Sequence, residues 1–345
     1  MWLLIVIVVD YFKQLVASSV QRNATHLYCT ADKSPAIKKM GRLEFLQVRK
    51  SSAQDLQDIA DGLLNKEQKS RLDSNGHILI RTGFDSLHRL HIRIVKDASI
   101  SEITTIIEEI NTQSRADLPP ALIQAVSCTQ SGMLLLGGAH HHNKQLTIRC
   151  LLAEVCALQR KTVLTFGVHD LQNSVLENTI ISSYSLEQMN VNLVRFQAAD
   201  IVIFGDVSPE VMAIAHDCVM LGMLVIIAVD ASNIPNTVTR TISMFPDSDT
   251  GKKFLATCLI AVAFQVIITT KVNCSNLYLY DFVPCSDTLR QKIDDGQEWL
   301  AGSTEIVDKM NKLIENGELA YYDVHPILAA LTDTVTKCGE DKDTF

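Results

Sequence analysis

The sequence lacks the features that mark several classes of protein. It has no C-x-x-C pair among its nine cysteines and no basic run longer than two residues. Scattered cysteines, several of them in apolar stretches, are typical of buried free thiols in a reducing cytosol. A formal net charge of −8 without a basic patch argues against nucleic acid as the main partner and favours protein partners.

The apolar start of the chain is too short for a membrane anchor. Residues 1–9 are apolar, whereas a spanning helix needs about 20 such residues, and Asp10 and Lys13 end the run. No basic residue precedes the run, as one would in a signal peptide. We therefore expect a helix or strand that packs on its own domain, in a cytoplasmic protein without a transmembrane segment.

What is present suffices for two globular domains, because 345 residues with 47% hydrophobic content can bury two cores. The first 100 residues combine short β-rich stretches at 77–81 and 90–95 with helical periodicity at 53–72, which predicts a small α+β domain. Residues 100–126 have a helical pattern and end near two prolines. We expect this stretch to connect the domains.

Continuous apolar strands alternate with helical stretches in the second half, which is typical of a parallel sheet covered on both faces. A RecA-like core is the expected result. The predicted strands are 133–136, 162–166, 200–204, 224–229 and 266–270. A helical C-terminal part follows at 289–334, with breaks at Gly296, Gly302 and Gly317.

Between the strand at 133–136 and a helix at 147–158 lies a loop with the spacing of a phosphate-binding P-loop. Such a loop reads G-x-x-x-x-G-K-[ST], since backbone N–H groups and the lysine hold phosphates and the hydroxyl binds Mg²⁺. Here the second glycine is Asn143 and the hydroxyl residue is Gln145. Asn tolerates positive φ, but an amide oxygen is a poor ligand for octahedral Mg²⁺.

Long, ordered motifs along nearly the whole chain resemble the type IV pilus retraction ATPases, the PilT/PilU branch of the secretion-motor superfamily. Residues 23–28 (NATHLY) and 36–42 (AIKKMGR) resemble motifs of that family's PAS-like N-terminal domain. Residues 199–206 resemble its Walker B segment, with Asp206 in place of the final Glu. Segments 221–231 and 237–246, and Gln265 in a helical A-V-x-x-Q motif, continue the match.

The resemblance also extends to the retraction motif, A-I-R-N-L-I-R-E-G, at 288–296. The positions that match are Leu289, Arg290, Ile293 and Gly296, while the second arginine is Asp294.

Most departures from the family fall on residues that, by the resemblance, would bind or hydrolyse the nucleotide. The catalytic glutamate box aligns with 166–169 (FGVH), where no carboxylate stands unless Asp170 substitutes by a shift of register. The nucleotide-sensing histidine is Asp230. Of two N-domain arginines that reach a neighbour's nucleotide in the family, Arg93 remains and the other is His91.

The resemblance implies a PAS-like domain at 1–105, a linker at 106–125, a RecA-like P-loop NTPase core at 126–285 and a helical subdomain at 286–345. It also implies ATP and Mg²⁺ as cofactors, weak or absent here, held by Gly138, Asn143, Lys144 and Gln145. Arg93 would lie between subunits of a homo- or hetero-hexamer. Asp206 is either a Mg²⁺-linked acid or a surface-facing strand end.

Three functions stay open. The first is a catalytically impaired ring subunit, a pseudo-ATPase, beside an active paralogue at the inner-membrane platform protein of a type IV pilus, in twitching motility. The second is an active ATPase with an atypical loop, so enzymatic activity is undecided. The third is a regulatory or assembly protein outside the pilus system. The adjacent His140, His141 and His142 predict no metal site, because neighbouring side chains on a tight loop diverge.

Overall fold

The computed structural model describes residues 2–39, 42–85, 88–109, 118–139, 142–168, 179–270, 276–296 and 304–336. The chain divides into two compact units. One comprises Met1–Asn111 with Asn273–Asn276, and the other comprises Thr112–Val272 with Leu277–Phe345. Within the described residues no helix is long and apolar enough to span a membrane.

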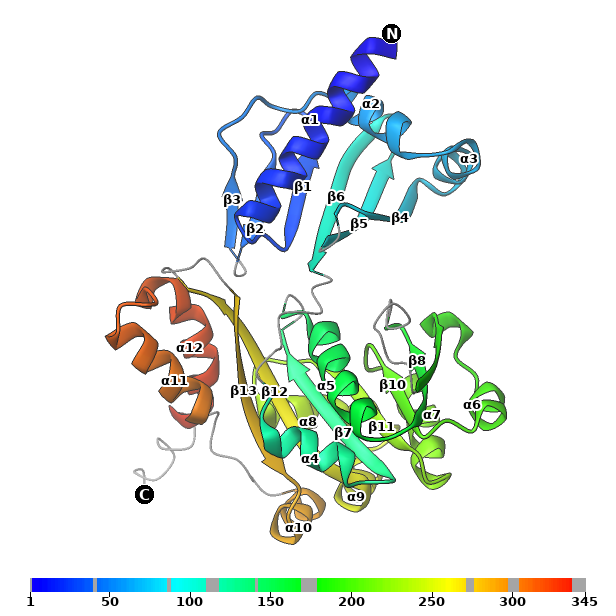
Figure 1. Ribbon diagram of the computed structural model, residues 1–345, viewed down its shortest axis with the longest axis vertical. Helices are drawn as coiled ribbons and strands as arrows, with labels where there is room; N and C mark the ends of the chain where they lie inside the picture. The colour runs from blue at the N-terminus through cyan, green and yellow to red at the C-terminus, as the bar shows by residue number, and fades with distance from the viewer. Residues whose placement is uncertain are drawn as a thin grey trace. The chain divides into compact units, whose positions relative to one another are not determined.

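The first unit is a six-stranded antiparallel sheet in the order β3-β2-β1-β6-β5-β4, with helices packed on one face (Figure 1). The core consists of alternate strand residues, such as Ile92 and Ile94, and of apolar helix residues, such as Leu15 and Leu56. Its elements are α1 (Trp2–Gln21), β1 (His26–Thr30), β2 (Ala36–Lys39), β3 (Arg42–Phe45), α2 (Ala53–Leu63), α3 (Lys66–Asn75), β4 (His77–Gly83), β5 (His88–Lys96) and β6 (Ile100–Glu109).

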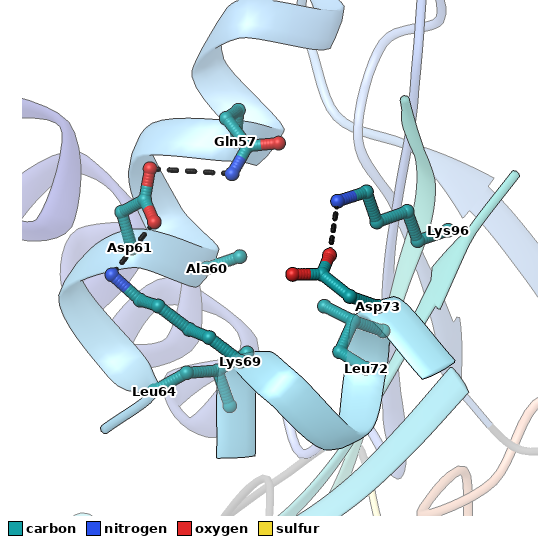
Figure 2. A pocket seen from close by; sticks show the side chains of 8 residues that line it. All are labelled: Gln57, Ala60, Asp61, Leu64, Lys69, Leu72, Asp73 and Lys96. Atoms are coloured by element: carbon teal, nitrogen blue, oxygen red, sulfur yellow. Dashed lines mark hydrogen bonds and ion pairs between the residues drawn. The ribbon is translucent and has the colours of Figure 1, made fainter. Parts of the chain in front are cut away.

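Ion pairs hold α2, α3 and β5 together around a cavity of about 90 Å³ (Figure 2). Lys69 of α3 pairs with Asp61 of α2 at 2.7 Å, and Lys96 of β5 pairs with Asp73 of α3. The stretch at 53–72 for which helical periodicity was predicted contains two helices, α2 and most of α3.

The helix predicted for 100–126 is wrong over its first ten residues, which form β6. Ile100, Ile103 and Ile107 have helical spacing, but the segment is rich in β-branched residues, which favour a strand. β6 pairs with β1 on one side and with β5 on the other, so its backbone N–H and C=O groups find partners on both sides within the sheet. The expected linker at 106–125 thus contains the end of β6 and the start of α4 (Pro120–Ser127).

The second unit is built on a seven-stranded sheet in the order β13-β12-β7-β11-β10-β8-β9, parallel from β12 to β9. Helices α4 and α5 cover one face, and α8 packs on the other, as Figure 1 shows. The elements are β7 (Gly132–Gly138), α5 (Lys144–Leu158), β8 (Lys161–Phe166), β9 (Thr179–Tyr184), α6 (Val191–Gln197), β10 (Ile201–Phe204), α7 (Pro209–Met220), β11 (Leu224–Asp230), α8 (Ile234–Ile242), α9 (Ser248–Cys258), β12 (Leu259–Thr269), β13 (Asn276–Pro284), α10 (Asp287–Asp295), α11 (Thr304–Glu315) and α12 (Tyr321–Thr336).

Four of the five predicted core strands are confirmed within a few residues, and the fifth begins earlier than predicted, at Leu259. Strands β9 and β13 were not predicted. The C-terminal helices are also confirmed, and Gly296 and Gly317 have the positive φ that ends a helix. Gly302 lies outside the described residues.

The prediction of buried thiols holds for only part of the cysteines. Cys29, Cys156, Cys218 and Cys258 are buried, whereas Cys128, at the end of α4, is exposed. Cys128 lies between Ser127 and Thr129, in a polar stretch, whereas Cys258 lies in an apolar run.

Candidate functional site

The candidate site lies at the carboxyl edge of the parallel sheet, where β7 ends at Gly138 and α5 begins at Lys144. Gly137 must be a glycine, because a Cβ there would lie 2.2 Å from the Thr237 hydroxyl of α8. The close approach of β7 and α8 fixes the point from which the loop departs. The predicted order of strand, loop and helix is confirmed, although the helix begins at Lys144 and not at Thr147.

Asn143 has the conformation that a P-loop glycine would supply. Its φ of 34° and ψ of 53° are left-handed, and its side-chain oxygen accepts a hydrogen bond from the Leu146 N–H at 3.3 Å. Asn143 thus caps α5 with its own side chain. The helix N–H that it uses belongs to the set that binds phosphate at a P-loop.

Lys144 is buried, with 8% of its side chain exposed, and three acceptors surround its ammonium. Nζ donates to the Gly138 carbonyl at 3.1 Å, to the Ala139 carbonyl at 3.2 Å and to Oδ1 of Asp230 at 2.5 Å. An ammonium has three N–H donors, so protein atoms use them all. The sequence comparison showed that Asp230 replaces a histidine of the family, but it did not predict this ion pair.

The charges at this edge cancel one another. Asp206 and Arg240 also act on the Lys144 charge, and Arg240 donates to the Asp230 carbonyl at 2.9 Å. Burial lowers the pKa of the Lys144 ammonium from its ordinary value, and the hydrogen bond and charge of Asp230 oppose that effect. Two cations and two carboxylates give this cluster a formal charge of zero.

His142 joins the loop to the neighbouring strand β12. Its Nδ1 lies 3.2 Å from the Gln265 carbonyl oxygen, and the Gln265 side-chain amide donates to the His142 carbonyl. Gln265 is in register with Gly138 across the two strands. The helix expected around Gln265 from the resemblance is wrong, since α9 ends at Cys258 and the residue belongs to a strand.

Within the described residues no three His, Cys, Asp or Glu side chains are grouped to hold an ion. His140 and His141 lie outside the described residues.

The residues present do not fit ATP and Mg²⁺ in this arrangement. Lys144 has no donor left for phosphate, Asn143 takes a helix N–H, and Gln145 brings no hydroxyl to a metal. Among the described residues, the buried Oε1 of Gln265 has no partner, and as an acceptor it offers no hydrogen bond to a phosphate oxygen. The three Lys144 donors and the capped N–H of α5 are thus used within the protein.

The positions at which the resemblance places acidic residues offer little catalytic chemistry. Gly167, which follows β8, has no side chain, and a Cβ there would lie 2.8 Å from Leu186. Asp206 is exposed, and its Oδ1 accepts a hydrogen bond from the Val207 N–H at 2.7 Å. The alternative acid, Asp170, lies outside the described residues.

The four matching residues of the retraction-like motif hold α10 in place. Leu289 and Ile293 are buried, and Gly296 ends the helix with a φ of 68°. Arg290 donates to the carbonyls of Ala256 and Thr257, at 2.8 and 3.0 Å, and so satisfies the end of α9. Each of the four residues therefore has a structural role at α10.

Arg93 lies in the first unit, on the sheet face opposite the helices. It is exposed on β5, between Leu79 of β4 and Thr104 of β6. Leu79 is 55% exposed and the nearby Ile106 is 38% exposed. This open face combines a cation with accessible apolar side chains.

Comparisons with known proteins show the fold. No family model matches the chain, and no curated protein matches it in sequence. The crystal structure of the pilus retraction motor PilT with bound ADP superposes with a TM-score of 0.68, covering 91% of this chain and 96% of PilT at 14% identity.

The ATPase DotB gives similar results. The Legionella pneumophila structure covers 96% of both chains at a TM-score of 0.65, and the Yersinia pseudotuberculosis structure covers 92% of this chain and 93% of its own at 0.68. Both are 14% identical to this chain. The expected succession of an N-terminal domain and a RecA-like domain is thereby confirmed.

Proposed function

We propose that this chain is a non-hydrolysing subunit of a secretion or pilus motor of the PilT and DotB type. Likeness of fold over nearly the whole length supports the motor superfamily. The observation that carries the loss of hydrolysis is the saturation of Lys144 by three protein acceptors. Phosphoryl transfer relies on charge neutralisation and positioning, and this site offers no net positive charge and no carboxylate at Gly167.

An assay of phosphate release from ATP and Mg²⁺ tests the loss of hydrolysis. We expect no turnover above that of the Lys144→Met variant. The double variant Asn143→Gly with Gln145→Ser restores the loop consensus but not the water-positioning acid, so it too should stay inactive. Turnover by the wild type that Lys144→Met abolishes would favour the active ATPase instead.

The open face of the first unit is proposed to contact a neighbouring subunit in a hexameric ring, either a second copy or an active paralogue. The exposed Leu79 and Ile106 support this arrangement, because burying apolar side chains against a neighbour would stabilise the ring. The platform protein of a pilus is the proposed partner of the ring.

Light scattering of the full chain without nucleotide tests the ring. We expect assembly in the apo state, weakened by Leu79→Asp because apolar burial stabilises the contact. Arg93→Ala should leave assembly unaffected or slightly favour it, since without a bound phosphate Arg93 would face another cation, the Lys144 loop of the neighbour. A strict monomer that becomes a hexamer only with ATP and Mg²⁺ would contradict the proposal.

A further inference from the structure

Asp230 is placed to act on the loop by the geometry of its strand. It is the last residue of β11 and lies in register with Gly138, where the loop leaves β7. Leu224, Ile226 and Ala228 belong to the core under α5, and strand residues alternate between faces. Asp230 therefore projects toward the face on which α5 begins with Lys144.

A free anion could reach Lys144 only by displacing this carboxylate. The other two acceptors are backbone carbonyls, that of Gly138 at the end of β7 and that of Ala139 after it, and both are neutral. The carboxylate is tethered beside the ammonium, so it competes at a high effective concentration. It also supplies negative charge near the N-terminus of α5, where an anion is favoured.

We infer that Asp230 is the specificity-determining residue of this site: it occupies the phosphate position from within the chain and excludes anionic ligands. The inference rests on the proposed function, and it adds that the Lys144–Asp230 ion pair persists at any nucleotide concentration. A subunit of this kind would hold one conformational state while its neighbours cycle.

The test is calorimetric titration of the full chain with sodium pyrophosphate in EDTA, at matched ionic strength. We expect no measurable binding by the wild type and at least a tenfold gain in affinity for Asp230→Asn, which keeps the shape and removes the charge. Lys144→Met added to Asp230→Asn should abolish the gain. Asp230→Glu, which keeps a carboxylate, should bind no better than the wild type.

Asp206→Asn is the matched control, because it removes one negative charge from the same edge without touching the Lys144 hydrogen bonds. An equal gain in this control would overturn the inference, since overall charge would then suffice. Wild-type binding as tight as that of Asp230→Asn would also overturn it. If Asp230→Asn does not fold, Asp230→Ser carries the same expectation and the same refutation.

The outcome is separable from that of the proposed function. Turnover of ATP by the wild type would refute the loss of hydrolysis. Absence of a gain in Asp230→Asn, with the wild type inactive, would refute only the role of Asp230.

Discussion

Helices α2 and α5 each begin beside a carboxylate of the protein and a cation that pairs with it. The two carboxylates differ in how far they lie from the helix along the sequence. At α2, Asp55 is the third residue of the helix, and Arg49 binds it through both guanidinium nitrogens at 2.7 and 2.8 Å. At α5, the carboxylate is Asp230, which lies 86 residues beyond Lys144 in the chain. One helix start is satisfied locally, and the other by a neighbouring strand.

The difference separates a structural cap from a replaced ligand. Helix N-termini favour negative charge whatever its source. Asp55 supplies it in a capping box with Ser52, a pattern found at helices of any function. Asp230 supplies it at the strand edge where a P-loop protein receives phosphate from solution, so its presence bears on function.

The largest effect should come from removing Asp230. Asp230→Ala leaves the buried Lys144 ammonium without its counter-ion, so we expect a loss of about 3 kcal/mol in the free energy of unfolding. Urea denaturation of the full chain measures it. Asp206→Ala, at an exposed position of the same edge, should change stability by less than about 0.5 kcal/mol. Equal losses in the two variants would mean that the Lys144–Asp230 ion pair stabilises the fold no more than an exposed carboxylate does.

Removing the local carboxylate should cost somewhat less. Asp55→Ala breaks the paired bonds to Arg49 and the bond from the Ser52 N–H, for an expected loss of about 2 kcal/mol. The same denaturation experiment on Asp58→Ala, which loses only an exposed hydrogen bond from Gln54, is the control. If the Asp55 loss exceeded that of Asp230, burial of the cation would not decide the cost.

The Asp55 contribution should also depend on pH. Hydrogen bonds from Arg49 lower the pKa of Asp55 from 3.8 to about 2, so the folded protein binds its proton less readily than the unfolded chain. The stabilisation is therefore complete above the unfolded pKa and is lost as pH falls from about 4 to about 2. The stability difference between wild type and Asp55→Asn should shrink between pH 7 and pH 3. A constant difference would exclude the ionic contribution.

The same contrast explains what the sequence could predict. The strands β7, β8, β10 and β11 were recognisable because each is a short, largely apolar run between helical stretches, and the loop because its position depends on local order. β6 was missed because isoleucines at helical spacing conceal a strand that two neighbours stabilise. The Lys144–Asp230 pair was missed because it joins residues far apart, although alternation along β11 indicates the face on which Asp230 lies.

The smallest effects should separate strain from capping at the two helix starts. Asn143 has φ 34° and Ser52 has φ −80°, so only Asn143 occupies a conformation that costs most residues about 1 kcal/mol or more. Asn143→Ala should therefore lose both the cap and the backbone fit, about 1.5 kcal/mol, whereas Asn143→Gly should lose only a few tenths. At Ser52, alanine loses the cap alone, about 1 kcal/mol. Thermal unfolding of the four variants, including Ser52→Gly, gives the alanine-to-glycine difference at each position. That difference should be larger at Asn143, because glycine relieves strain only there; equal differences would show that the loop relaxes out of the left-handed conformation and that its backbone is not held by Lys144 and His142.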